Sequence, residues 1–316
     1  NARFALTGTP VENRLSELWS IFDFLMPGFL YSYRKFRERY ELPIVKNQDP
    51  EALTALRRMT GPFVLRRLKK DVLRELPTKE ERIVYSAASG RQQKLYTASA
   101  LKLKEALAGG AWSGNGKLEV LSQLMRLRQI CCDPALCFED YTGESAKLET
   151  CVSLIASASA AGHKILLFSQ FASMLERIRE RLLQEGISSH LLVGATPKEE
   201  RSRMVQAFAS DEVPVFLISL KAGGTGLNLT AADIVIHYDP WWNVAAQNQA
   251  TDRAYRIGQE KPVTVYKLIL KDTIEENLLK LQNAKLALAA QVVSEGMVSL
   301  GDLSQNELME LFEQNP

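Results

Sequence analysis

In the first third of the chain, apolar residues recur every three or four positions, a spacing that predicts amphipathic helices. Pro27 and Gly28 end the first of these helices. The same spacing further along the chain predicts another helix. The apolar positions of the two helices are Leu15, Leu18, Trp19, Phe22, Leu25 and Met26, and then Leu118, Leu121, Leu124, Met125 and Leu127.

From about Lys147 onward, short apolar runs alternate with helical patterns. Gly186 closes one predicted helix, and capping boxes at Thr196–Glu199 and Thr273–Glu276 open two others. A further helix is predicted over 243–255. Strands that alternate with helices indicate a parallel sheet covered on both faces, which is an α/β fold. The predicted strands are 164–168, 187–193, 214–220, 234–238 and 263–269.

The composition is that of a folded protein. The chain has 316 residues, 46% hydrophobic and 24% charged, which suggests about two domains and excludes disordered and fibrous classes. It contains no apolar run of about 18 residues, so we expect no membrane span. The first residue is Asn, and no charged and apolar leader precedes Phe4. We therefore expect no signal peptide and regard the chain as part of a longer protein.

Cysteines and histidines give no sign of a metal site. The chain has four cysteines, and the spacing of Cys131, Cys132 and Cys137 is not that of zinc ligands. Buried thiols are the simpler interpretation. The three histidines are scattered along the sequence. A metal-dependent nuclease or deaminase is therefore not expected.

The net charge of +2 hides an asymmetry. Between Tyr31 and Arg82, 14 Lys or Arg residues stand against 8 Asp or Glu, whereas from Asp272 to the end the counts are 2 and 8. A basic stretch and an acidic tail are compatible with nucleic-acid contact at one end. Solvated helix faces carry such runs as well, so the charge pattern alone decides little.

Ligands of parallel sheets bind in the loops that follow the strands. After the predicted strand 214–220, the segment Lys221–Leu229 carries three glycines within four positions, at Gly223, Gly224 and Gly226. Such glycines allow backbone amides to turn toward a phosphate. A tight turn without a ligand is the alternative. The position at a strand end favours phosphate binding.

Two adjacent tryptophans, Trp241 and Trp242, follow the predicted strand 234–238. Because neighbouring side chains point in different directions, we expect at most one of them to lie fully in the core. The other could stack against nucleic acid, and plain packing is the competing interpretation.

The predicted helix 243–255 carries Gln249 and Arg253, and Arg256 follows directly. Offsets of four and three residues place these three side chains on one helix face. Two arginines on one face repel each other unless an anion joins them, so a phosphate partner is the economical explanation. Solvation by water is the alternative.

Taken in order, these segments resemble the SWI/SNF-type ATPases, which are DNA translocases of helicase superfamily two. The resemblance runs from Phe4 to about Lys285 in the order of the family. The matching segments are 6–10 and 12–19 (motif III), 63–79 (the segment joining the two lobes), 127–136 (a helical insertion), 165–171 (motif IV), 219–229 (motif V), 239–243 (the tryptophan segment) and 249–259 (motif VI).

The sequence departs from the family pattern in three respects. Val244 stands where proline is usual, and Tyr255 stands where histidine is common. Neither position is a phosphate ligand in the family. The third departure is an absence, because the G-K-T/S loop and the D-E-x-H box of the family precede motif III, and neither occurs in these residues. The resemblance therefore implies half of an active site, so we expect no hydrolysis by this chain alone.

The resemblance also implies roles for particular residues. ATP would bind between two RecA-like lobes, with Mg²⁺ held mainly by the missing first lobe and no cofactor bound by this chain alone. Arg253 and Arg256 would be arginine fingers. Gln249 would support them, and Gly224 and Gly226 would lie against the nucleotide. No metal ligand is expected. The candidate DNA-binding residues are Thr7, Thr9, Ser169, Gln170, Lys221, Asn228, Trp241 and Trp242.

The expected fold class is α/β, with a RecA-like parallel sheet preceded by helical insertions typical of the family. The expected domains are 1–85 (end of lobe one with a helical insertion and the inter-lobe segment), 86–146 (helical insertion of lobe two), 147–286 (lobe two) and 287–316 (acidic helical tail). The expected partners are double-stranded DNA, the missing lobe, and DNA-bound proteins or RNA polymerase, with no membrane. The location would be the cytoplasm and nucleoid in a prokaryote, or the nucleus in a eukaryote. The rival hypothesis is a non-catalytic α/β module that binds nucleic acid or protein.

Overall fold

The computed structural model describes residues 2–6, 15–47, 49–65, 76–88, 90–109, 116–223, 227–280 and 282. The chain divides into two compact units between residues 75 and 76, so the division falls before the boundary predicted after residue 85. Within the described ranges, every helix is too short or too polar to cross a lipid bilayer.

The first unit is helical, as its apolar spacing predicts. Pro27 and Gly28 follow the end of its first helix, and Gly28 adopts a φ of 81° that suits glycine. A small core gathers Phe22, Leu30, Phe36, Tyr40 and Leu56. The elements are α1 (Leu15–Leu25), α2 (Tyr33–Phe36), the π-helical η1 (Arg37–Glu41), α3 (Leu42–Asn47), α4 (Pro50–Thr60) and the 3₁₀ turn η2 (Gly61–Phe63).

The second unit contains a six-stranded parallel sheet in the order β1-β6-β5-β2-β4-β3. All five predicted strands are present, and β1 is an additional one. β1 lies at the edge of the sheet, and most of its side chains are exposed, so it lacks the apolar run that identifies a buried strand. The strands are β1 (Lys79–Ser86), β2 (Ile165–Ser169), β3 (Ser189–Leu192), β4 (Val215–Ser219), β5 (Ile234–His237) and β6 (Val263–Leu270).

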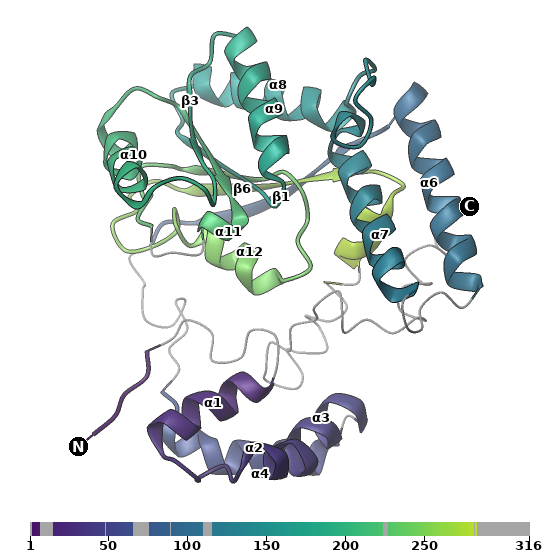
Figure 1. Ribbon diagram of the computed structural model, residues 1–316. Helices are drawn as coiled ribbons and strands as arrows, with labels where there is room; N and C mark the ends of the chain where they lie inside the picture. Colours follow the sequence, from purple (N-terminus) through teal and green to yellow (C-terminus); the bar gives the residue numbers. More distant parts are fainter. Residues whose placement is uncertain are drawn as a thin grey trace. The chain divides into compact units, whose positions relative to one another are not determined.

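Helices cover both faces of this sheet (Figure 1). On one face, α8 (Ala146–Ala160) and α9 (Ala172–Gln184) pack against Leu167 and its in-register neighbour Leu217. On the other face, α10 (Lys198–Ser210), the short α11 (Leu220–Gly223) and α12 (Val244–Thr251) pack against the alternate strand residues. The predicted α/β class with helices on both faces is therefore confirmed.

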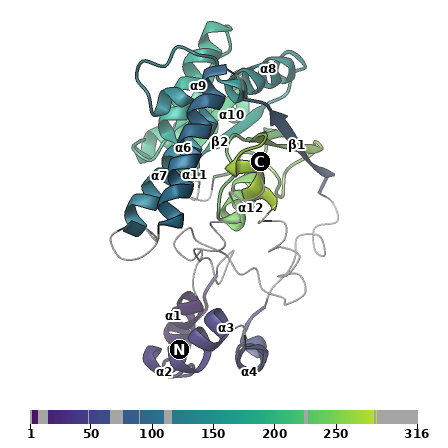
Figure 2. The ribbon, with the colours of Figure 1, turned by 90° about the vertical axis from the view of Figure 1, so that its right-hand side faces the viewer.

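Two long helices run side by side next to the sheet in both views (Figures 1 and 2). They are α6 (Gly90–Ala108) and α7 (Gly116–Cys132). The Gln92 Nε2 donates to the Ile130 carbonyl across this pair at 3.0 Å. The 3₁₀ turn η3 (Pro134–Leu136) follows α7. These helices lie in the segment predicted as a helical insertion.

The predicted helix ends are only partly as expected. Gly186 closes α9 with a φ of 73°, as predicted. The box at Thr196 is wrong, because its Oγ1 accepts from the Val193 N–H at 3.1 Å and α10 starts at Lys198 without a side-chain cap. Thr273 and Glu276 do cap the helix over 274–280, with each bond one residue earlier than in the standard box.

Candidate functional site

Three adjacent strands of the sheet, β5, β2 and β4, end together at one edge. Ser169 lies in register with Ser219, and Phe168 lies in register with His237. Because the strands are parallel, the loops that follow them meet at this edge. These loops carry most of the residues that the sequence singles out.

The carboxylate of Asp239 organises the loop after β2. It is fully buried and accepts from the Ser169 hydroxyl at 2.5 Å and from the backbone N–H of Gln170 at 3.3 Å. The Gln170 side-chain amide also donates to it. Ser169 and Gln170, both predicted to contact DNA, are thus brought together but face Asp239. A phosphate contact through the Ser169 hydroxyl would require this bond to break.

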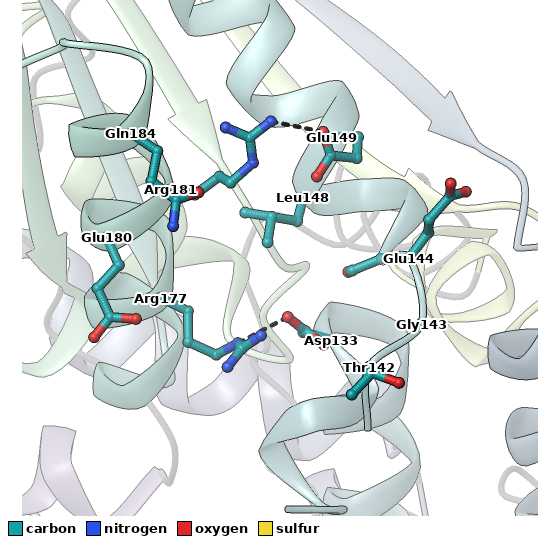
Figure 3. A pocket seen from close by; sticks show the side chains of 11 residues that line it. Asp133, Thr142, Gly143, Glu144, Leu148, Glu149, Arg177, Glu180, Arg181 and Gln184 are labelled. Atoms are coloured by element: carbon teal, nitrogen blue, oxygen red, sulfur yellow. Dashed lines mark hydrogen bonds and ion pairs between the residues drawn. The ribbon is translucent and has the colours of Figure 1, made fainter. Parts of the chain in front are cut away.

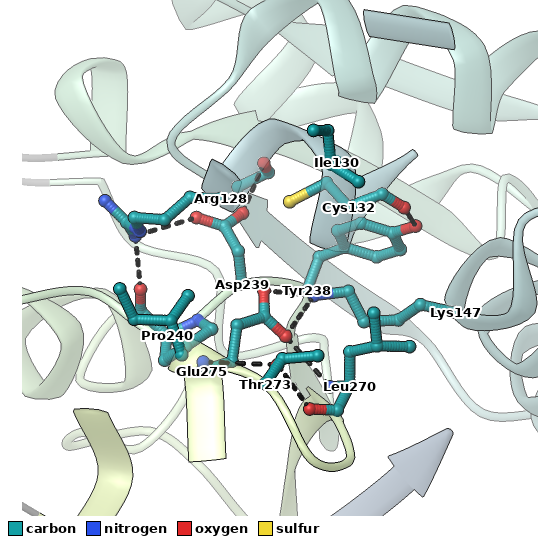
Figure 4. A network of polar contacts seen from close by, with 12 residues as sticks. Arg128, Ile130, Cys132, Lys147, Tyr238, Asp239, Pro240, Leu270, Thr273 and Glu275 are labelled. Carbon is teal, nitrogen blue, oxygen red and sulfur yellow. Dashed lines mark hydrogen bonds and ion pairs between the residues drawn. The ribbon is translucent and has the colours of Figure 1, made fainter. Parts of the chain in front are cut away.

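Arg128 of α7 completes this network, and sequence reasoning missed it. Its Nη1 donates to the Gln170 Oε1 at 2.8 Å. Its Nη2 donates to the Pro240 carbonyl at 2.6 Å (Figure 4). The side chain is 2% exposed. One signal could have revealed it, because Arg128 stands one helical turn from Leu124 and from Cys131 on an apolar face.

The two tryptophans separate as expected. Trp242 is buried, with the Arg128 guanidinium 5.6 Å from the centre of its ring, whereas Trp241 is half-buried. The Trp241 carbonyl accepts from the Gln282 side-chain amide. The prediction that at most one of them is a core residue is therefore confirmed. Trp241 is the more accessible of the two predicted DNA contacts.

The helix that carries Gln249 ends earlier than predicted. α12 ends at Thr251, so Arg253 and Arg256 lie in the turns that follow and do not continue one helix face. The helix ends because backbone carbonyls beyond Thr251 have partners outside the helix. The Leu229 N–H donates to the Arg253 carbonyl at 3.0 Å. The Gln259 side chain also takes up the Ala254 carbonyl, at 3.2 Å.

The two arginines instead contact the segment that follows the glycine cluster. The Arg256 Nη1 donates to the Leu227 carbonyl at 3.2 Å, next to the bond between Leu229 and Arg253. Arg253 is 8% exposed. Burial and the neighbouring Arg256 charge both lower its pKa. The charge of Asp252 acts in the opposite direction. Arg256 is half-buried, and two cations placed close together favour an anionic ligand at this corner of the molecule.

Several predicted residues cannot be placed in this geometry. Thr7, Thr9, Gly224 and Gly226 lie outside the described residues, as does the side chain of Lys221. Asn228 is exposed between the buried Leu227 and Leu229, so its side chain is accessible from solvent. Gln249 is half-buried on α12.

The two departures from the family pattern fit the structure. Val244 is the first residue of α12, after the cap that Asn243 makes to the Ala246 N–H at 3.0 Å. Proline also suits that helix position, so valine replaces it without losing a bond. The Tyr255 hydroxyl donates to the Pro77 carbonyl at 3.0 Å. Tyr255 therefore connects the predicted inter-lobe segment to the arginine segment.

A buried ion pair, also missed from the sequence, lies next to the Asp239 network (Figure 4). The Lys147 Nζ contacts the Glu275 Oε1 at 2.5 Å and the Oε2 at 2.7 Å, and both side chains are almost completely buried. Burial lowers the pKa of Lys147, but the attraction of Glu275 outweighs burial and the net pKa is raised. Lys147 is therefore charged, and this pair joins α8 to the helix over 274–280.

A pocket of about 350 Å³ lies between α8, α9 and the loop after α7 (Figure 3). Its arginines are already neutralised, since Arg177 pairs with Asp133 at 2.8 Å and Arg181 pairs with Glu149 at 3.2 Å. This pocket therefore offers little net positive charge to bind an anion. In the described part of the chain, no three His, Cys, Asp or Glu side chains gather as metal ligands either. Arg253 and Arg256 therefore stay the candidate residues for binding an anion.

Comparison with known proteins identifies these segments. Residues 1–136 match the SNF2-related domain, and residues 146–258 match the helicase conserved C-terminal domain. A Bacillus subtilis protein named for an ATP-dependent helicase/translocase is 43% identical over 98% of this chain and 34% of its own length. The chain spans about a third of the length of the curated relatives it matches.

Solved structures agree with the sequence comparison. The SWI2/SNF2 ATPase core of Sulfolobus solfataricus in complex with double-stranded DNA is 36% identical, with a TM-score of 0.63 over 98% of this chain and 66% of that one. The C-terminal domain of the SWI2/SNF2 ATPase from that organism is 31% identical, with a TM-score of 0.61 over 75% of this chain and all of that one. The sheet is therefore RecA-like, and the chain belongs to the SNF2 family of helicase superfamily two.

Proposed function

We propose that this chain supplies the second RecA-like lobe of an ATP-driven translocase that moves along double-stranded DNA. One observation carries the proposal. Arg253 and Arg256 are hydrogen-bonded to residues 227–229, directly after the glycine cluster, so the two segments that would face a triphosphate form one unit. Their charges favour an anion at that corner.

The proposed chemistry follows from these side chains. The first lobe would supply most of the protein ligands of the Mg²⁺ ion, and ATP would supply the phosphoryl group. Arg253 and Arg256 are the residues of this chain that would hold it, and the cationic donor set fits a polyphosphate. A guanidinium stays protonated even when burial lowers its pKa, so each arginine would offer a fixed positive charge. Such a charge acts strongly in a water-poor site.

The proposed DNA contacts lie on the loops at the same sheet edge. Asn228 and Trp241 have accessible surface there, and Lys221 precedes the glycine cluster. Contacts of this kind would address the phosphate backbone without reading sequence, as movement along DNA requires. The Sulfolobus relative with this fold is a DNA complex, which supports the same type of partner here.

The test is DNA-stimulated ATP hydrolysis, measured with this chain alone and with the chain preceded by a first lobe that carries the G-K-T/S and D-E-x-H motifs. We expect stimulated turnover only in the two-lobe protein, together with displacement of a third strand from triplex DNA. Turnover by the chain alone would contradict the half-site assignment. A two-lobe protein that binds DNA but never hydrolyses ATP would favour the non-catalytic binding module.

A further inference from the structure

We propose that Arg128 is a positioning residue, which holds the loops after β2 and β5 in the arrangement that DNA requires. The expected effect on DNA binding rests on the proposed function, whereas the contacts of Arg128 that hold the loops do not depend on it. Arg128 belongs to α7, outside the sheet, and its partners lie 42 and 112 residues further along the chain. It therefore joins three separate elements at one point.

The contacts of Arg128 go almost entirely to the loops. Nη1 binds the Gln170 side chain, Nη2 binds the Pro240 carbonyl, and the guanidinium lies against the Trp242 ring. The closest carboxylate oxygen, on Asp239, is 3.9 Å away. Asp239 itself is occupied by Ser169 and Gln170. Arg128 thus closes a ring of polar contacts in which each loop holds the other.

This pattern differs from that of an ordinary stabilising ion pair. Lys147 and Glu275 make two short bonds to each other, and their partners are core elements. Arg128 is equally buried, but its two hydrogen bonds go to a neutral side-chain amide and a backbone carbonyl in the loops. A buried charge with such partners fixes loop geometry more than it adds stability.

The end of α7 strengthens the link to the strand ends. The Tyr238 hydroxyl donates to the Cys132 carbonyl at 2.8 Å, and Asp133 binds Arg177 of α9. Tyr238 and Pro240 flank Asp239, so the end of α7 is attached to the chain on both sides of that residue. A displacement of α7 would therefore move the loops after β2 and β5 with it.

The first test measures backbone hydrogen exchange in the 316-residue chain without DNA, comparing Arg128→Met, Arg128→Lys and the control Lys147→Met. Both Arg128 variants should speed exchange at the Gln170, Phe171 and Trp241 amides. Arg128→Lys should not restore the slow exchange of the parent, because a single ammonium cannot reach two diverging acceptors as the forked guanidinium does. Lys147→Met should leave these amides unchanged, because its effect is on the surroundings of Glu275, whose carboxylate still accepts from the Leu270 N–H at 2.9 Å.

The second test uses the two-lobe protein. The DNA concentration for half-maximal stimulation of hydrolysis should rise about 10- to 100-fold in both Arg128 variants, the scale expected for misplaced contact groups. ATP affinity should change little, and Lys147→Met should lower melting temperature without shifting DNA half-saturation. If Arg128→Met does not fold, Arg128→Lys carries the same expectations.

The outcomes separate the two claims. Two results together would overturn the positioning role: exchange at the loop amides as slow as in the parent, and a DNA concentration for half-maximal stimulation within about twofold of the parent. A twofold change is only a few tenths of a kcal/mol. If the parent two-lobe protein shows no DNA-stimulated hydrolysis, the proposed function fails. The exchange measurement then still decides whether Arg128 positions the loops.

Discussion

Replacing Lys147 by methionine tests how the core of the second unit is held together. Methionine keeps the length of the side chain but removes the charge, which leaves the Glu275 carboxylate buried without its cation, accepting from the Leu270 N–H at 2.9 Å. Breaking a buried ion pair on one side costs about 3–5 kcal/mol. At about 2–4 °C per kcal/mol for a domain of this size, the melting temperature should fall by about 6–20 °C.

The double variant Lys147→Met with Glu275→Met separates the pair from its surroundings. Apolar replacement of both partners is often close to neutral. The double variant still leaves the buried Leu270 N–H without its acceptor, which costs about 1–3 kcal/mol. We therefore expect the double variant to be more stable than the single one, although less stable than the parent.

The assay is urea unfolding of the parent and the two variants at pH 7 and pH 5. In Lys147→Met, burial keeps the pKa of Glu275 above its unfolded value, as it already does in the parent. A carboxyl group with a raised folded pKa loses stability as pH rises through that range, so the deficit of the single variant should shrink at pH 5. A deficit below about 1 kcal/mol at pH 7 would show that Lys147 and Glu275 contribute no more than a solvated surface pair.

Three further predictions concern other parts of the chain. Burial lowers the pKa of His237 to about 3, so between about pH 6.5 and pH 3 this histidine takes up a proton in the unfolded protein but not in the folded one. In urea unfolding, the parent should therefore lose about 1.4 kcal/mol of stability per pH unit between pH 6 and pH 4 relative to His237→Gln. An equal dependence of stability on pH in the two proteins would contradict this. Gly258 has a φ of 96°, so Gly258→Ala should cost about 1–2 kcal/mol in the same assay, whereas no loss would mean that the turn relaxes. The affinity of the chain for duplex DNA should fall linearly on a log–log plot against salt, by about 0.9 per phosphate contact and equally for unrelated sequences; fluorescence anisotropy at several salt concentrations checks this, and a salt-independent affinity would argue against backbone contacts.

The sheet was predictable because buried parallel strands are continuous apolar runs between helical patterns. β1 was not, since Lys79, Glu80, Glu81 and Arg82 open an edge strand whose side chains face solvent. Cap details also depend on tertiary context, as the bond between the Thr196 Oγ1 and the Val193 N–H illustrates. Local sequence gives the elements, and competing partners decide their ends.

The site was predictable in its segments but not in its contacts. The glycine cluster and the arginines stand out in the sequence, yet the bond between Leu229 and Arg253 ends α12 early and replaces the predicted helix face. The pairing of Arg128 with Pro240 spans 112 residues, and no local pattern encodes such a contact. A charged residue on an apolar helix face indicates only that some buried partner exists.

We infer that Arg256 acts on charge that develops during phosphoryl transfer. The deciding measurement is DNA-stimulated hydrolysis by Arg256→Ala and Arg256→Lys in the two-lobe protein, with melting temperature, nucleotide affinity and DNA affinity recorded on the same samples. Arg181→Ala is the matched control, since that arginine pairs with Glu149 on α8 and with Glu185, which follows the end of α9. We predict that both Arg256 variants lose about 10³–10⁵ in turnover with little change in binding, the scale of a missing arginine finger. Turnover close to that of the parent and of Arg181→Ala, in a protein that is merely less stable because the bond to Leu227 is lost, would contradict the account.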